Sequence, residues 1–479
     1  MSDHSNKQTR TEPDLKIDFG RLRKGYEAEP YPPHQVRAAR LAKLDALIRD
    51  NEAALVDALN TDFGCRSKTE SMLAEILCSL DSIKYARQNL RKWMRKRGRR
   101  TSFWARPAKV YARAQPLGVV GIMAPWNYSL DLTLSPLTAA LAAGNRVMVC
   151  MSPETPTLYQ TLSALIESVF TPSEVRIYLG SDELSPAFAA LPFDHLLFTG
   201  STRVGRLVAK AAAENLTPIT LELGGKSPAI VAPDFNITEA AERISWGKTF
   251  NAGQTCVAPD YVMIPKGSED AFTTALLEKF TTSFHSMDDS DLTAVISERF
   301  YKRLTLMVED AEAKGATILR PAGFEPTAKG GVFKMPLTVV MNPPEDATLM
   351  QEEIFGPVLP VLTYQAFSEV AAYVNAKERP LAVYCFSHNR STIDHLQEQT
   401  VSGQFGLNET LIHYAQEDLA FGGVGSSGTG AYHGQAGFDT FSHLKSVLEQ
   451  RGFFGFTGLK LLHPPYGRVT NLLVSLMKR

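Results

Sequence analysis

The alternation of short apolar runs with longer amphipathic segments after Lys109 constrains the fold more than any other feature of this sequence. A run that is apolar at every position is typical of a strand buried on both faces, and such strands occur in parallel sheets covered by helices. The first series of predicted strands comprises Gly118–Ala124, Arg146–Cys150, Val175–Leu179, His195–Thr199, Ile219–Leu223 and Ala229–Ala232. The predicted helices include Thr157–Val169, Thr202–Asn215 and Ile237–Phe250.

The same pattern recurs beyond Asp260 and indicates a second sheet. Its predicted strands are Tyr261–Ile264, Leu337–Met341, Leu359–Leu362 and Leu381–Phe386. A chain of 479 residues has room for two successive α/β domains, since it is about three times the usual domain length. In front of them, leucines at helical spacing predict one helical stretch from Pro33 to a stop at Gly64. A second amphipathic helix is predicted over Glu70–Trp93.

The composition excludes several classes of protein. A hydrophobic fraction of 44% with 21% charged residues is too apolar for a disordered chain. The 50 basic and 51 acidic residues give a formal charge of −1, so no overall field attracts nucleic acid or an anionic membrane. The polar start of the chain lacks an apolar signal segment, and the weakly polar stretch 117–130 is too short to cross a bilayer. We therefore expect a soluble, cytoplasmic protein.

The five cysteines are too few and too scattered for a disulfide framework, and an odd number leaves at least one free thiol. The most distinctive is Cys256, which ends the segment Phe250–Cys256 shortly after Gly253. A cysteine behind a glycine-containing turn can present its sulfur and its own backbone N–H to one ligand, as nucleophilic attack on a carbonyl requires. Taken alone, such a residue is better interpreted as a buried structural cysteine.

Two polar side chains lie at the ends of predicted strands. Glu222, in the segment Leu221–Lys226, ends an apolar strand, where burial raises the pKa of a carboxylate and suits it to act as a general base. Asn127, in the segment Ala124–Asn127, carries an amide that can donate to an oxyanion. The alternatives are a solvent-facing glutamate and a turn-forming asparagine.

Two further segments suit a nucleotide. Phe198–Gly205 is predicted to form a strand, a Gly-Ser turn and a helix, and a helix N-terminus reached through glycine suits phosphate. This signal is weak on its own, because the segment lacks the spacing of the dinucleotide fingerprint. Gln351–Pro357 offers Glu353 and Phe355, which can hold a ribose and a nicotinamide ring, and its alternative is an exposed acidic loop.

In this order and at these intervals, the five segments resemble the aldehyde dehydrogenase superfamily, and the resemblance covers nearly the whole chain from about Val36. Glu222 and Cys256 lie 34 positions apart, as the general base and the nucleophile do in that family. Further segments are similar to its class 3-like branch: Phe421–Gly428, Ala431–Gly434 and Phe438–His443. The ending Leu459–Gly467 is similar to that of bacterial coniferyl aldehyde dehydrogenases.

The resemblance implies NAD(P)-dependent oxidation of an aldehyde to a carboxylic acid, with no metal. It assigns Cys256 as the nucleophile that forms a thiohemiacetal, and Asn127 as a donor to its oxyanion. Hydride transfer then leaves a thioester, and Glu222 activates the water that releases the acid. The residues that the resemblance implies for binding NAD or NADP are Trp126, Gly200, Ser201, Gly205, Leu223, Gly224, Glu353 and Phe355.

The resemblance also implies an α/β fold of the aldehyde-dehydrogenase type and a homodimer. It consists of a cofactor-binding domain built on a doubly wound parallel sheet, an α/β catalytic domain and a small β oligomerisation arm. The expected bounds are 1–98 and 118–223 for the cofactor-binding domain, 224–424 for the catalytic domain, 99–117 and 442–467 for the arm, and 468–479 for an amphipathic C-terminal tail.

The sequence departs from the family pattern at two places. Cys150 stands where the family has a lysine for the adenosine ribose or its phosphate, and Pro153 stands where it has a ribose-binding glutamate, with Glu154 one position late. Two cofactor contacts are therefore missing, which leaves three alternatives: weak binding of NAD(P), a differently oriented cofactor, or loss of NAD-dependent activity. The choice between NAD and NADP also stays open. Ser129 and Asp131 also replace the usual residues near the family's substrate entrance, which puts the usual aldehyde substrate in doubt.

Two alternatives to aldehyde oxidation remain open at this point. One is an enzyme that uses the same cysteine to reduce an activated acyl group or to transfer it. The other is a cofactor-impaired pseudoenzyme that acts as a binding protein. Covalent chemistry is preferred, because Cys256, Glu222, Asn127 and Glu353 are all present.

Two further segments, one basic and one amphipathic, suggest contacts at the surface. Arg91–Arg100 holds seven basic residues in ten, and we interpret it as a solvated helix end and linker rather than a nucleic-acid site, since the overall charge is balanced. The tail presents apolar residues at helical spacing: Val469, Leu472, Leu473, Leu476 and Met477. Docking on the protein itself or on a subunit partner is favoured over contact with a membrane surface, because so short a helix with three basic groups binds a membrane only marginally.

Overall fold

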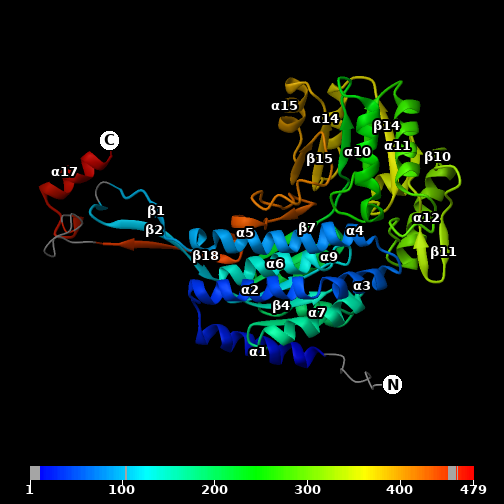
Figure 1. Cartoon of the computed structure of the whole chain (residues 1–479). Coiled ribbons are helices and arrows are strands. Elements are labelled where there is room, and N and C mark those ends of the chain that lie inside the picture. Colours follow the sequence, from blue (N-terminus) through cyan, green and yellow to red (C-terminus); the bar gives the residue numbers. More distant parts are fainter. Residues whose placement is uncertain (1–10, 103–104, 451–459, 461, 479) are drawn as a thin grey trace, which may run out of the picture.

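The computed structural model describes residues 11–102, 105–450, 460 and 462–478. The described residues form two α/β bodies and a slender arm that projects from one of them (Figure 1). Both bodies are built on a mostly parallel sheet with helices packed against it, so the predicted α/β fold class is confirmed. Beyond Lys109, the predicted strands and helices are all present, and their ends differ from prediction by no more than two residues.

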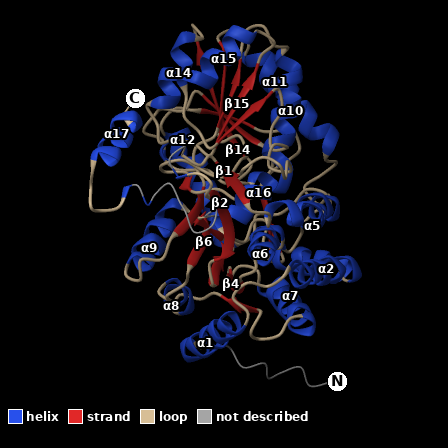
Figure 2. Ribbon diagram, turned by 90° about the vertical axis from the view of Figure 1, so that its left-hand side faces the viewer, coloured by secondary structure: helices blue, strands red, loops and turns tan. Residues whose placement is uncertain are grey.

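The first sheet has six strands in the order β17-β7-β6-β3-β4-β5. Their bounds are Gly428–Thr429 (β17), Ile219–Leu223 (β7), His195–Gly200 (β6), Val119–Met123 (β3), Arg146–Met151 (β4) and Val175–Leu179 (β5). All neighbours are parallel except β17. Every residue of β3 and β4 is buried, because helices cover both faces. Figure 2 shows α8 (Leu184–Ala189) and α9 (Thr202–Ala213) on one face, and α6 (Asp131–Ala143) and α7 (Pro156–Val169) on the other.

The second sheet has seven strands in the order β10-β13-β14-β9-β8-β15-β16, of which only β10 runs antiparallel to its neighbour. The strands are Thr317–Leu319 (β10), Thr338–Met341 (β13), Val358–Tyr364 (β14), Tyr261–Pro265 (β9), Pro228–Val231 (β8), Ala382–Phe386 (β15) and Gln404–Leu407 (β16). The helices α10 (Ile237–Thr249) and α11 (Glu269–Ser283) pack together on one face, and α14 (Ser368–Asn375) and α15 (Arg390–Gln399) lie on the other (Figure 2). The smaller elements are α12 (Glu298–Ala313), α13 (Thr348–Gln351), α16 (Gly434–Thr440), β11 (Thr327–Lys329) and β12 (Val332–Lys334).

The N-terminal helices correct two predictions. The stretch from Pro33 to Gly64 is not one helix but two, α2 (His34–Asp50) and α3 (Glu52–Phe63), because the backbone leaves the helical region at Asn51. Helix α1 (Glu12–Ala28) was not predicted, since its pattern is mostly polar. The predicted stop at Gly64 is confirmed, with a φ of 71°. The next stretch runs through α4 (Lys68–Ser71), a π-helical segment η1 (Met72–Leu77) and α5 (Cys78–Trp93).

The arm is a separate three-stranded antiparallel sheet in the order β1-β2-β18. Its strands are Arg97–Arg99 (β1), Lys109–Pro116 (β2) and Ser442–Glu449 (β18). The linker interpretation of the basic segment is therefore wrong for β1, which pairs with β2, and the Arg97 Nη1 atom lies 2.8 Å from a carboxylate oxygen of Asp439.

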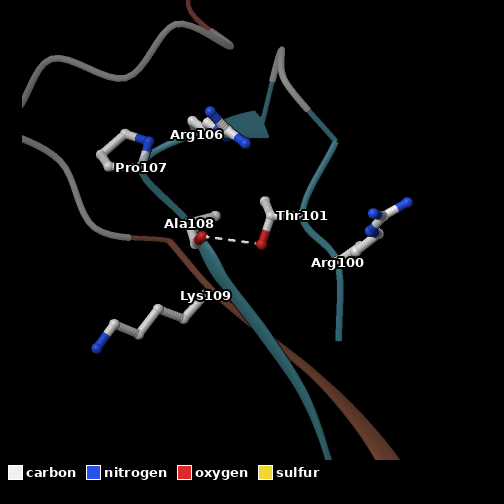
Figure 3. A pocket seen from close by; sticks show the side chains of 6 residues that line it. All are labelled: Arg100, Thr101, Arg106, Pro107, Ala108 and Lys109. Carbon is white, nitrogen blue, oxygen red and sulfur yellow. Dashed lines mark hydrogen bonds between the residues drawn. The ribbon is translucent and has the colours of Figure 1, made fainter. Parts of the chain in front are cut away.

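At the end of the arm lies a shallow pocket lined by Arg100, Thr101, Arg106, Pro107, Ala108 and Lys109. Figure 3 shows the Arg100 and Lys109 side chains extending to opposite sides. The pocket is therefore not a converging cradle for an anion.

The C-terminal helix α17 (Arg468–Met477) lies on the same side of the molecule as the arm (Figure 1). Its apolar side chains are largely exposed, including Val469 at 57%, Leu472 at 62% and Leu476 at 58%. The predicted amphipathic helix is present, but docking on the described part of its own chain is not observed. Within the described residues, none of the helices has both the length and the apolarity needed to cross a membrane.

Candidate active site

The first sheet places two of the predicted segments at one crevice. From β3 the chain proceeds outward through β4 and β5, and it then returns to β6 and β7 on the other side of β3. Such a reversal between neighbouring strands opens a crevice at their carboxyl ends, where open α/β sheets bind ligands. Trp126 and Asn127 follow β3, and Gly200 and Ser201 lie at the end of β6. The crevice between β3 and β6 is therefore bounded by residues that were predicted from the sequence to form the site.

The loop that carries Cys256 follows α10 through a tight 3-10 turn, Phe250–Gly253. Asn251 and Ala252 adopt left-handed backbone angles, with φ of 52° and 53°, and Gly253 follows at 67°. A Cβ atom at Gly253 would lie 2.5 Å from the carbonyl oxygen of Gly356, so only glycine fits this close approach. The turn is thus held in a conformation that its surroundings must stabilise.

Amide side chains provide that stabilisation and join the cysteine loop to the end of β3. Asn251 Nδ2 donates to the carbonyl oxygens of Asn127 at 3.0 Å and Gln254 at 3.2 Å. Asn127 Nδ2 donates to the same Gln254 oxygen at 3.1 Å. Asn127 and the residues next to Cys256 therefore form one hydrogen-bonded unit, although Asn127 follows a strand of the first sheet and Cys256 precedes a strand of the second.

Two supporting residues were not predicted from the sequence. The side chain of Gln254 donates to the carbonyls of Asn251 at 2.9 Å and Ala294 at 3.0 Å, and its oxygen accepts from the Ile296 N–H at 3.0 Å. Glu70 accepts from the Asn251 N–H at 3.1 Å. Gln254 lay inside the motif that drew attention to Cys256, whereas nothing in the sequence near Glu70 signals its contact with a loop 181 residues away.

Two sets of groups shift the pKa of the Cys256 thiol in opposite directions. Burial, and then the negative charges of Glu353 and Glu222, raises the pKa of this thiol to about 12. The backbone N–H groups of Cys256 and Val257 point toward the sulfur and act in the opposite direction. Both carboxylates predicted from the sequence therefore lie within electrostatic reach of the sulfur. A thiolate forms here most readily when they are neutral or hydrogen-bonded.

Glu222 is 3% exposed near the end of β7, so the solvent-facing alternative is wrong. Neither of its carboxylate oxygens has a hydrogen-bond partner among the described residues, and burial raises its pKa well above the usual range. A buried carboxyl without partners is costly unless it is neutral or meets a water or ligand. Glu222 is thus poised to accept a proton from a group that enters the site.

The nicotinamide-side residues converge at the junction of the two bodies. Glu353 accepts from the Gly225 N–H, and a Cβ atom at Gly224 would lie 2.1 Å from the Glu353 carboxylate oxygens. Burial raises the pKa of Glu353 to about 8. The ring of Phe355 meets that of Trp126 edge to face, with centroids 5.3 Å apart. Glu353 therefore packs against the backbone at Gly224 and Gly225 and is not part of an exposed acidic loop.

The phosphate-side residues lie at the start of α9. The Ser201 hydroxyl caps this helix by accepting from the Val204 N–H at 3.4 Å. A Cβ atom at Gly205 would lie 2.7 Å from a methyl carbon of Leu223, so the glycine allows the helix to pack closely on β7. A helix N-terminus at the switch crevice fits the pyrophosphate of a dinucleotide.

Comparison with known proteins agrees with this arrangement. A protein-family model described as "Aldehyde dehydrogenase family" matches residues 23–447, which is most of the chain. The chain belongs to the aldehyde dehydrogenase family. It is an enzyme of that family, and the resemblance proposed from its motifs is confirmed.

Among curated relatives, this aldehyde dehydrogenase is 45% identical over 461 residues to a "Probable coniferyl aldehyde dehydrogenase" of Pseudomonas aeruginosa, covering 96% of this chain and 95% of the relative. It is 40% identical to the "Coniferyl aldehyde dehydrogenase" of Pseudomonas sp. strain HR199, covering 95% of both. It is 35% identical to human "Aldehyde dehydrogenase family 3 member B1", covering 95% of this chain and 96% of that one. The predicted class 3-like branch is thereby confirmed.

Two solved structures share its fold. The "Substrate bound state of Staphylococcus Aureus AldH" matches with a TM-score of 0.91 and 35% identity, covering 97% of this chain and 99% of that one. The "NAD+ complex structure of aldehyde dehydrogenase from bacillus cereus" matches with a TM-score of 0.84 and 26% identity, covering 92% of this chain and 90% of that one.

At and beside the two positions where the sequence departs from the family's cofactor-binding pattern, the structure has a buried cysteine and an ion-paired glutamate. Cys150 is 3% exposed with its sulfur 3.9 Å from the Ser185 hydroxyl, and burial raises the pKa of its thiol to about 12. Glu154 forms an ion pair with Arg299 at 2.7 Å.

The two residues near Asn127 that depart from the family pattern are buried in the protein. Ser129 and Asp131 are each 0% exposed, and their effect on the choice of substrate stays a prediction. The Asp131 carboxylate accepts from the hydroxyls of Ser79, Ser135 and Tyr414. The five cysteines are all free.

Proposed function

We propose that this aldehyde dehydrogenase oxidises an aromatic aldehyde of the coniferyl type to its carboxylic acid, with NAD or NADP as hydride acceptor and Cys256 as nucleophile. The observation that carries the proposal is the hydrogen-bonded unit that joins Asn127 to the Cys256 loop, beside a buried Glu222 without partners. The names of the relatives support the substrate class, and the NAD+ complex of the Bacillus cereus structure supports the cofactor.

The cofactor-binding residues fit a dinucleotide at two of its three parts. Gly200, Ser201 and Gly205 fit the pyrophosphate, and Glu353 beside Gly224 fits the nicotinamide ribose. The adenosine ribose lacks its usual partners at positions 150 and 153. When bound, NAD(P)+ supplies the acceptor for the hydride that leaves the aldehyde carbon.

The residues of the chain perform the remaining chemistry. The Cys256 thiol gives its proton to water, and the thiolate sulfur then bonds to the aldehyde carbon. The resulting oxyanion accepts from the Asn127 amide and the Cys256 N–H. An amide nitrogen carries two hydrogens, so Asn127 keeps one for Gln254 and has one for the oxyanion. Loss of the hydride leaves a thioester. Glu222 takes a proton from water, the hydroxide adds to the thioester carbon, and the sulfur leaves.

The proposal is tested by mass spectrometry with Glu222→Gln, which keeps the shape of the side chain but cannot take the proton from water. Incubated with coniferyl aldehyde and NAD+ or NADP+, it should accumulate an acyl group on the Cys256 peptide, whereas Glu214→Gln on the exposed end of α9 should not. Cys256→Ser should give neither adduct nor reduced nucleotide. Absence of both adduct and reduced nucleotide in the unmodified enzyme, across aromatic and aliphatic aldehydes, would overturn the proposal.

A further inference from the structure

A chain of hydroxyl groups connects a buried carboxylate to the active site. The carboxylate of Asp131, at the start of α6, accepts from the Tyr414 hydroxyl. The Tyr414 hydroxyl in turn lies 3.4 Å from the Tyr432 hydroxyl. Asp131 is 0% exposed and Tyr432 is 1% exposed, so water does not compete freely for these bonds.

The far end of this chain lies beside the catalytic pair. Tyr432 follows β17, whose Gly428 is opposite Glu222 in the sheet. Burial, and then the negative charge of Glu222, raises the pKa of the Tyr432 hydroxyl, and the Cys256 thiol acts in the same direction. The Phe421 ring packs edge to face against both tyrosines and holds them in place.

The direction of the hydrogen bonds follows from the number of hydrogens. An ionised carboxylate can only accept, so Tyr414 must give its single hydrogen to Asp131. The contact between the tyrosines then requires Tyr432 to donate to Tyr414. The hydrogen of Tyr432 is thereby turned away from the active site, and its oxygen remains an acceptor toward Glu222 and Cys256.

We propose that Asp131 is a positioning residue for thioester hydrolysis: through Tyr414 it orders the Tyr432 hydroxyl so that Tyr432 and Glu222 together hold the attacking water by its two hydrogens. This proposal rests on the proposed function. One hydrogen of the water passes to Glu222, the other stays hydrogen-bonded to Tyr432, and the oxygen bonds to the thioester carbon. A protonated Asp131 donates to Tyr414 and reverses the chain, so that Tyr432 presents a hydrogen where an acceptor is needed.

Other groups surround Asp131 and bear on its ionisation. Burial raises the pKa of Asp131 to about 7, and the hydroxyls of Tyr414, Ser135 and Ser79 partly oppose this effect. The charged and titratable groups that face Asp131 or its nearest partners are Glu75 on η1, Cys78 on α5, Glu417 in the segment after β16, and Arg66, which pairs with Glu75. The rate of hydrolysis should therefore rise through neutral pH as Asp131 ionises.

The test uses an activated nitrophenyl ester, which acylates Cys256 without any nucleotide. The initial burst measures acylation, and the steady state measures thioester hydrolysis. Asp131→Asn should leave the burst rate and amplitude unchanged and lower the steady state about tenfold, the effect of one hydrogen bond on a barrier. Tyr414→Phe should do the same, and the double variant should lose no more than either single one.

Ser135→Ala is the matched control, because it removes a hydrogen bond to Asp131 and leaves Tyr414 in place. It should keep the maximal hydrolysis rate and move its pH profile to higher pH, since that bond favours the ionised carboxylate. A normal burst with unchanged hydrolysis in Asp131→Asn would overturn the inference, as would equal losses of burst and hydrolysis. No burst and no reduced nucleotide in the unmodified enzyme would instead contradict the proposed function.

Discussion

Asn127 shows how a common side chain acquires a specific role from its position. It is 3% exposed after β3, and its amide is bound to the backbone of the loop that carries Cys256. In the mechanism we propose, this fixed amide nitrogen donates to the carbonyl oxygen that becomes negatively charged. A donor held in advance loses little freedom when that charge develops, which is why such groups stabilise transition states.

Replacement of Asn127 by alanine should lower kcat for aldehyde oxidation by about 10²–10³-fold, because one oxyanion donor is lost. Steady-state kinetics with a saturating nucleotide measure this effect. Asn215→Ala is a suitable control, because that amide binds only a backbone carbonyl at the surface. Turnover of Asn127→Ala within a few-fold of the unmodified enzyme would contradict the oxyanion role.

At the scale of elements, the π-helical segment η1 shows how a buried charge can organise a neighbouring helix. Glu75 accepts from the backbone N–H groups of Leu130 and Asp131, both at 2.9 Å, at the start of α6. Its other oxygen lies 2.8 Å from Arg66 Nη1, and both side chains are 0% exposed. The ion pair therefore anchors the start of the helix that carries Asp131.

Arg66→Leu should lower the free energy of unfolding by about 3–5 kcal/mol, since it leaves the Glu75 carboxylate buried without its partner. Arg49→Leu removes an exposed ion pair with Asp45 and should leave the free energy of unfolding nearly unchanged. Chemical denaturation of both variants compares the two values. Equal stabilities would mean that the buried pair contributes no more than a surface one.

At the scale of the whole molecule, buried carboxyls set the response of stability to pH. The pKa values of Glu353 and Glu417 are raised by burial to about 8, against 4.5 for an ordinary glutamate. Between these values the unfolded chain has lost protons that the folded chain retains, so rising pH favours unfolding. Burial lowers the pKa of His413 to about 4 and that of His433 to about 3, against 6.5 for an ordinary histidine. These two rings make the folded chain more stable as the pH rises, but only at pH values below 6.5.

The melting temperature should therefore fall as the pH rises from 6.5 to 8, because the buried carboxyls that lose protons there outnumber the one buried amine with the opposite effect, Lys248, whose pKa is lowered by burial to about 8. Calorimetry at several pH values in this window measures the slope. Glu417→Gln should make the slope shallower, whereas substitution of the exposed Glu325 by glutamine should leave it unchanged. A melting temperature that is constant or rises over the window would contradict this account.

The arm and tail leave apolar surface exposed on the isolated chain. Leu448 on the edge strand β18 is 56% exposed, as are several residues of α17 to a similar degree. Among the described residues, β18 has a neighbouring strand on one side only, and an edge strand with exposed leucines favours pairing with a second copy. The homodimer thus stays a prediction, which the sedimentation of the intact enzyme would measure.

The sequence by itself determined the α/β class, most of the parallel strands and the family, because an apolar run buried on both faces and a motif around Cys256 are local signals. It also selected Asn127, Glu222 and Glu353, which the structure brings to one junction. Only the tertiary structure decided that Glu70 supports the Cys256 loop and that Asp131 is buried against Tyr414. The first contact joins residues 181 positions apart, and the second joins residues 283 positions apart. Their energies depend on the burial of the side chains and on the direction of the hydrogen bonds, and a local sequence pattern contains neither.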